Sequence, residues 1–343
     1  MTRSRLHTIL IGVFLAAFIV FLAIFNAMKP RILVLHSYGA ESPWSQRVNS
    51  GIQQILKKNR TPVTVRYHYL GLESSLDPNR VRNAVNDAHR AIALQRPDLV
   101  ISVDDESNQH VVRDYANKDR PKIVYVATLL SPDYYGYDTA GNASGIQERL
   151  PLDAVRETIL VVRKGKAARI AVLAMDDLTG QAELEQVTAY HWGPHRLVAT
   201  KASNSFHEWQ QFIQNQADQA DLLLVLSYDG LVRSSQDRQT VPHNEIAAWI
   251  EKNAKPLPIG LDTTYTEDGG GLSITPAPGD FGEKAMTMAL HWLSSPKGTA
   301  PPEAMNGSPH FKVGIRNSLL EARGIELPAI YLEAARVNGS LLP

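Results

Sequence analysis

The chain has 343 residues, of which 44% are hydrophobic and 20% charged, so it can bury a sizeable core and is long enough for two domains or lobes. Lysine plus arginine and aspartate plus glutamate number 35 each, and this balance leaves no net field that would attract nucleic acid. The sequence contains no cysteine, which excludes disulfides, thiolate metal sites, a cysteine nucleophile and lipid attachment through a cysteine.

The N-terminus carries a long uncharged segment, ILIGVFLAAFIVFLAIF at 9–25. With its flanking residues the segment reaches the roughly 20 residues that a bilayer-spanning helix needs. A cleavable signal peptide is the alternative, but it has a shorter apolar core and small residues at the cleavage site. Phe25, two residues before Ala27, spoils the best such site. We therefore expect residues 1–28 to form a short cytoplasmic tail and a transmembrane anchor.

Charges on the two sides of this segment indicate its orientation only weakly, since Arg3 and Arg5 precede it while Lys29 and Arg31 follow it. With the N-terminus inside, everything from about Lys29 onward lies outside the cytoplasm. The expected location is a bacterial inner membrane, crossed once, with the soluble domain in the periplasm.

The first group of predicted strands consists of short, nearly continuous apolar runs, as parallel strands covered on both faces should be. They lie at 31–37, 63–70, 98–104 and 122–128. The clearest intervening helix begins at Asp77-Pro78, a capping residue followed by proline at the first helical position. Strand, helix and strand in this order predict a doubly wound sheet.

The same pattern then restarts, which predicts a second α/β lobe. Its strands are expected at 169–175, 196–201, 221–227 and 258–263, and its helices at 180–191, 205–217 and 243–253. A last strand is expected at 310–316.

The chain is expected to cross between the lobes three times. The segment 138–151 is rich in Gly, Asn and Ser and reads as one crossing, and 271–283 reads as another, where a strand runs into prolines before a helix. The predicted division is lobe 1 at 29–143 plus 278–305, and lobe 2 at 144–277 plus 306–343.

Polar side chains gather where the predicted strands end, which is where open parallel sheets bind ligands. Lobe 1 offers His36, Ser37, Tyr38, Asp104, Asp105, Glu106, Ser107 and Thr128, and lobe 2 offers Asp176, Asp177, Thr179, Ser227, Tyr228, Asp229, Asp262, Thr263, Thr264 and Tyr265. Carboxylates, hydroxyls and tyrosines on both sides of one cleft suit a small polar molecule with an amino group and an aromatic or apolar body.

Each of these residues also has a purely structural interpretation. An acidic residue at a strand end often caps the following helix, which applies to Asp105, Glu106 and Asp177. His36 has no visible base or nucleophile partner, which favours a structural histidine. Trp44 is expected to pack against its own lobe, with a cleft aromatic as the alternative.

The succession of motifs "ILVLHSY", "PDLVISVDDESNQHV", "KIVYVAT", "GNASGI", "RIAVLAMDD", "DLLLVLSYDG" and "GGGLSITPAPGDFGEKA" resembles the ABC-transporter substrate-binding family that includes tryptophan- and tyrosine-binding proteins. The resemblance covers nearly the whole chain after residue 30. It implies a type I periplasmic binding protein fold, in which two α/β lobes joined by three crossings close on a ligand. By position it implies cleft roles for Ser37, Tyr38, Asp104, Thr128, Asp176, Tyr228 and Asp262. Many members are anchored through a lipid-modified cysteine, which this sequence lacks.

Enzymatic function has little support in the sequence. It contains no G-x-S-x-G elbow, no Walker A loop and no G-x-G-x-x-G fingerprint. His191 and His195 form H-x-x-x-H, but the glutamate of H-E-x-x-H is absent and the Gly and Pro of HWGPH oppose a helix. We expect neither catalytic residues nor a metal or cofactor.

The expected function is therefore capture of a small solute for an ABC-type importer, with a membrane permease as partner. The ligand is expected to carry a cationic amino group, because Asp104, Asp176, Asp229 and Asp262 bring negative charge to the strand ends without comparable Arg or Lys residues. An α-amino acid is the first candidate class. The alternative is a ligand-sensing or scaffolding subunit of a membrane complex without a transport role.

Overall fold

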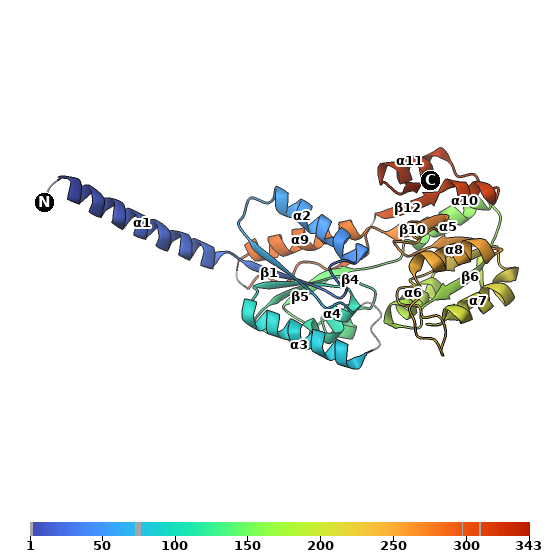
Figure 1. Ribbon diagram of the computed structural model, residues 1–343, viewed down its shortest axis with the longest axis horizontal. Helices are drawn as coiled ribbons and strands as arrows, with labels where there is room; N and C mark the ends of the chain where they lie inside the picture. Colours follow the sequence, from blue (N-terminus) through green and yellow to red (C-terminus); the bar gives the residue numbers. More distant parts are fainter. Residues whose placement is uncertain (1–2, 73–76, 297, 309) are drawn as a thin grey trace.

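The computed structural model describes residues 3–72, 77–296, 298–308 and 310–343. Two α/β lobes lie side by side, and the N-terminal helix α1 (Arg3–Met28) projects away from both of them (Figure 1). Within the described part of the chain, no helix qualifies as both long and apolar enough to cross a membrane, so the predicted transmembrane anchor is not confirmed.

The sheet of lobe 1 is parallel throughout and has the strand order β11-β5-β4-β3-β1-β2. Its strands are β1 (Arg31–His36), β2 (Thr64–Tyr69), β3 (Leu99–Val103), β4 (Lys122–Thr128), β5 (Ala143–Gln147) and β11 (Met305–Asn306). β1, β3 and β4 are buried almost from end to end. This explains their continuous apolar sequence, because helices cover both faces.

Helices α2 (Pro43–Lys58) and α9 (Pro278–Ser294) cover one face of this sheet, and α3 (Pro78–Gln95) covers the other together with the short α4 (Asp105–His110) (Figure 1). Single turns of 3-10 helix, η1 (Val112–Tyr115) and η2 (Pro132–Tyr135), complete this side. α2 and α9 approach so closely that a Cβ on Gly51 would lie 1.9 Å from the carbonyl oxygen of Gly279. α9, late in the sequence, is thereby built into lobe 1.

The sheet of lobe 2 has the order β13-β12-β10-β9-β8-β6-β7, with β12 antiparallel to β10 and the other pairs parallel. Its strands are β6 (Arg169–Ala174), β7 (Arg196–Ala202), β8 (Leu222–Val225), β9 (Leu257–Gly260), β10 (Leu272–Pro276), β12 (Phe311–Arg316) and β13 (Leu341–Leu342). The antiparallel β12 enters the lobe after the chain has returned from lobe 1.

The helices of lobe 2 also divide between two faces. α5 (Leu152–Val162), α10 (Asn317–Ala322) and α11 (Ala329–Val337) pack on one face, and α7 (Phe206–Asn215) and α8 (His243–Asn253) on the other. α6 (Leu178–Ala189) follows β6, and the 3-10 turn η3 (Ala217–Gln219) follows α7. The two doubly wound lobes predicted from the sequence are thus present.

Local predictions agree with the structure at most strands and helices. The side chain of Asp77 accepts a hydrogen bond from the backbone N–H of Asn79 at 2.9 Å, as predicted for the cap of α3. The predicted lobe boundaries need correction at two points. The boundary at 143/144 falls at the start of β5, which pairs with β4, and Asn306 belongs to β11. The first crossing therefore follows Gln147, and the third follows Asn306.

Candidate functional site

A cavity of about 350 Å³ lies between the lobes, at the carboxyl ends of the parallel strands. Residues that follow β1, β3 and β4 supply its lobe 1 wall, and residues that follow β6, β8 and β9 supply its lobe 2 wall. This is the position that the topology of open α/β sheets assigns to a ligand, because loops of both lobes meet there.

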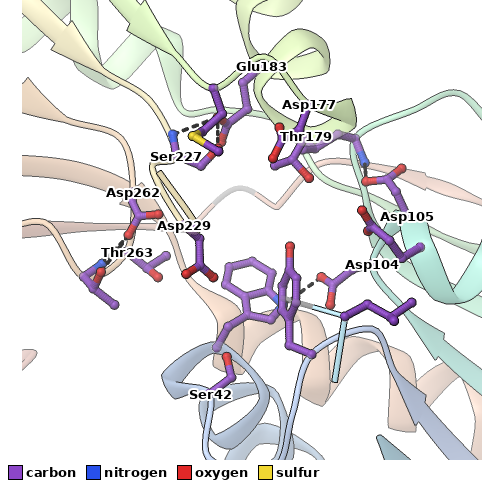
Figure 2. Close-up of a pocket in the computed structure, with 18 of the residues that line it drawn as sticks. Ser42, Asp104, Asp105, Asp177, Thr179, Glu183, Ser227, Asp229, Asp262 and Thr263 are labelled. Atoms are coloured by element: carbon purple, nitrogen blue, oxygen red, sulfur yellow. Dashed lines mark hydrogen bonds between the residues drawn. The ribbon is translucent and has the colours of Figure 1, made fainter. Parts of the chain in front are cut away.

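Acidic side chains from both walls line this cavity (Figure 2). They are Asp104, Asp105, Glu106, Glu148, Asp177, Glu183, Asp229, Asp262, Glu267 and Asp268. Two histidines, His110 and His243, also line it, whereas no lysine or arginine among the described residues does. The cavity is therefore a strongly acidic site.

Asp104 is a buried acid of the lobe 1 wall, with only 5% of its surface exposed. It follows β3 with a φ of 70°, and its side chain is directed toward the open centre in Figure 2. One carboxylate oxygen accepts a hydrogen bond from the indole N–H of Trp44 at 2.7 Å, while Oδ2 is buried and has no hydrogen-bond partner. Burial raises the pKa of this carboxyl, and the charge of Asp105 raises it further. Asp104 thus presents an acceptor that lacks a donor.

The two acids after Asp104 have different surroundings. Asp105 accepts hydrogen bonds from the backbone N–H groups of Leu129 and Leu130 at 3.0 and 3.1 Å, and another from the hydroxyl of Tyr135. It fixes the loop after β4 and is a structural residue. Glu106 has a buried, unpartnered Oε2, and burial raises its pKa to about 7.

On the lobe 2 wall, His243 lies between two carboxylates. Its Nε2 is 3.0 Å from Oδ1 of Asp229 and its Nδ1 is 3.8 Å from Oδ2 of Asp268. The hydrogen bond to Asp229 raises the pKa of His243. Asp262 is held by its own turn, since its Oδ1 accepts from the backbone N–H of Thr264 at 2.8 Å and from its hydroxyl at 2.9 Å.

Glu148 and Glu183 are two further buried acids of the lining. Glu148 stands at the first crossing and is 7% exposed, and its pKa is raised by burial and by the charges of Asp104 and Glu183. Glu183, on α6, accepts hydrogen bonds from the backbone N–H and the hydroxyl of Ser227 at 3.0 and 2.7 Å. Burial raises the pKa of Glu183 to about 7.

Apolar and aromatic groups complete the lining. Tyr38 and Trp44 stand beside Asp104, and further apolar contacts come from Leu72, Ala127, Leu129, Met175, Leu261 and Pro276. The cavity therefore combines acceptors for cationic groups with surface for an apolar body.

Of the eight residues predicted to bind the ligand, the structure brings four to the cavity: Tyr38, Asp104, Asp229 and Asp262. Ser37 and Thr128 are fully buried and do not line it. The hydroxyl of Ser37 donates to the carbonyl of Val103 and ties β1 to β3. The side chain of Thr128 lies inside lobe 1.

The other two predicted residues are also displaced from the cavity. Asp176 is exposed, and its side chain accepts from the amide of Gln181 at 2.7 Å, while the next residue, Asp177, lines the cavity and caps α6. Tyr228 is buried in lobe 2 and donates its hydroxyl to Asp268 at 2.6 Å. It supports the cavity wall from behind.

Sequence reasoning missed several lining residues. Glu148 lies in the segment interpreted as a crossing, and Glu183 and His243 lie within helices, away from the strand ends where the site was predicted. Trp44, assigned mainly to packing, lines the cavity and holds Asp104. The sequence did carry one signal for Glu148, which is that an acidic residue stands directly after β5.

Neither any protein-family model nor any curated protein matches the chain. Solved structures do. One is the ligand-free, open structure of CD0873 from Clostridium difficile, a substrate binding protein with adhesive properties. It is 18% identical to this chain with a TM-score of 0.65, and the match covers 88% of this chain and 96% of CD0873. The ABC domain in complex with L-Trp from Streptococcus pneumoniae is 18% identical with a TM-score of 0.64, covering 89% and 98%.

A periplasmic ribose ABC transporter protein from Conexibacter woesei is 15% identical with a TM-score of 0.55, covering 89% of this chain and 98% of its own. The chain thus has the type I fold of ABC-transporter substrate-binding proteins, as the resemblance of its motifs implied. Of these neighbours, one is described as a substrate binding protein, one as an ABC domain in complex with L-Trp and one as a periplasmic ribose ABC transporter.

Proposed function

We propose that the protein is an extracytoplasmic solute-binding protein that captures a small amino-bearing solute between its lobes for an ABC-type importer. The observation that carries the proposal is the interlobe cavity, which carboxylates line from both walls and no described lysine or arginine enters. Carboxylates suit cationic amino groups, since charge-assisted hydrogen bonds are about twice as strong as neutral ones. An integral-membrane permease is the implied partner.

The proposal includes attachment to the bacterial inner membrane through α1. This helix has 26 residues, about 39 Å at 1.5 Å per residue, and the sequence has no Asp, Glu, Lys or Arg from residue 6 to residue 28. Val13, Phe14 and Phe21 are more than half exposed, which is costly in water. Membrane fractionation with N-terminal sequencing tests this part. A soluble mature protein that begins near residue 28 would contradict it.

Closure of the lobes on the ligand is also part of the proposal, with bending at the segments after Gln147 and around Ala277. One interlobe contact favours the closed arrangement: Arg47 of α2 donates to the carbonyl of Thr263 at 3.1 Å and pairs with Glu267. Arg47→Ala should therefore enlarge the ligand-free protein in solution scattering. Arg66→Ala, an exposed arginine on β2, is the matched control.

A thermal-shift screen of amino acids, amines, sugars and dicarboxylates, followed by calorimetry, tests the proposed function. Stabilisation by amino-bearing compounds supports it. Stabilisation by sugars or dicarboxylates alone would contradict the ligand class but keep the binding function. Absence of any solute, together with a co-purifying membrane protein, would favour the sensing or scaffolding alternative.

A further inference from the structure

We infer that the solute carries two separated cationic amino groups and no carboxylate, which makes it a diamine or polyamine rather than an α-amino acid. The inference rests on the proposed solute-binding function and narrows its ligand class. It follows from three features of the cavity: the distribution of charge, an acceptor without a donor, and the placement of acids on opposite walls.

The first feature is that the cavity offers no uncommitted cation for a ligand carboxylate. His110 and His243 are its basic residues within the described chain. Burial lowers the pKa of His110, which keeps it neutral, and His243 is engaged between Asp229 and Asp268. A carboxylate entering the cavity would therefore meet like charge without compensation, which is unfavourable.

After the two histidines, the N-terminus of α2 is the strongest partner in the cavity for an acceptor group of the ligand. Its N-cap residue, Ser42, makes no side-chain capping bond, and Pro43 supplies no N–H. The positive end of a helix is equivalent to roughly half a charge. This partial positive charge is smaller than the full negative charge of the Asp104 carboxylate, which is hydrogen-bonded to Trp44 in the first turn of α2. The helix start thus does not reverse the preference for cations.

The second feature is the carboxylate of Asp104. This residue is only 5% exposed, it lines the cavity, and its buried Oδ2 has no hydrogen-bond partner. A buried polar group without a partner is rare and costly. An ammonium group of the ligand beside Tyr38 and Trp44 would supply both the missing donor and the compensating charge.

The third feature is that acids face the cavity from the opposite side as well. Asp229, Asp262 and Asp268 belong to lobe 2, and Figure 2 shows Asp229 and Asp262 across the open centre from Asp104 and Asp105. His243 offsets one of the charges of these three lobe 2 acids, which leaves the lobe 2 wall negative. A ligand with one amino group would neutralise one wall only. Two amino groups on an apolar chain neutralise both and place the chain against Met175, Leu129 and Leu261.

Calorimetry on the full chain in detergent tests the inference with matched ligands. 1,5-Diaminopentane is lysine without its carboxylate, and pentylamine is the same chain with one amino group. We expect the best of 1,3-diaminopropane, 1,4-diaminobutane, 1,5-diaminopentane and spermidine to bind at least about tenfold more tightly than both L-lysine and pentylamine. Tryptamine should likewise exceed L-tryptophan. Calcium ion is included as a competing cation.

Each other outcome overturns the inference, and the outcomes separate it from the proposed function. Equal or tighter binding of L-lysine or L-tryptophan would reject the diamine class and keep solute binding. Binding of sugars without amines would do the same. If Ca²⁺ displaced the amines at equal concentration, the acids would form a metal site and the diamine inference would fail. If no solute bound at all, the inference and the proposed function would fail together.

Discussion

Replacement of Asp104 by asparagine is the most direct test of how the cavity binds a cation. Asparagine has nearly the same shape, and its side-chain oxygen can still accept the hydrogen bond that the indole of Trp44 now donates at 2.7 Å. The substitution therefore removes the charge without removing the contact that positions the side chain. What is lost is the second oxygen, which has no partner in the free protein.

The expected magnitude follows from burial. Asp104 is 5% exposed, so a hydrogen bond from a ligand ammonium would be shielded from water. A hydrogen bond to a charged group contributes about 1.5 to 3 kcal/mol. This corresponds to affinity that is weaker by roughly 10- to 150-fold. The same free energy should not be lost from folding, because Oδ2 has no hydrogen-bond partner before the ligand binds.

Calorimetric titration with the best amine at a pH above 7 measures this loss, and thermal melting checks that the variant is folded. Asp176→Asn is the matched control, since Asp176 follows a strand end in the same way but is exposed and lies outside the cavity lining. We expect its affinity to stay within about twofold of the parent. A folded Asp104→Asn variant that bound the amine as tightly as the parent would refute the role assigned to Asp104.

Two further predictions concern pH and packing. Burial raises the pKa values of Glu106 and Glu183 to about 7, and only their ionised forms attract a cation. Affinity for an amine should therefore rise by about tenfold per contacting group between about pH 6 and pH 8. Binding below pH 8 should release protons, which is measured as a binding enthalpy that depends on the buffer. An affinity that did not change with pH would exclude both groups from contact with the amine. Gly51→Ala should lower the free energy of unfolding by about 1 to 3 kcal/mol in denaturant titrations, because its Cβ would lie 1.9 Å from the Gly279 carbonyl oxygen. Gly141→Ala is the control and should change stability little, since a Cβ there would meet nothing within 4 Å. Equal stability of the two variants would contradict the close α2–α9 contact.

The sequence alone determined most strands, because parallel strands buried on both faces must be apolar throughout. β5 is an exception to this rule, because it is buried but its sequence is not apolar throughout. Its sequence, ASGIQ, falls in the Gly-, Asn- and Ser-rich segment interpreted as a crossing. Gly145 is nevertheless required where the strand packs, because a Cβ there would lie 1.9 Å from the backbone oxygen of Tyr125. The residue that made the segment look irregular is the one that lets the strand pair with β4, and this displaced the predicted lobe boundary.

The sequence also placed the site at the strand ends, but only the tertiary structure decided which side chain of each pair enters the cavity. Asp177 lines it whereas Asp176 does not, and Asp229 lines it whereas Tyr228 turns into the core of lobe 2. Past the end of a strand, side chains no longer alternate regularly, because each turn has its own backbone angles. The left-handed φ of 70° at Asp104 is one such angle, and the pattern of residues did not predict it.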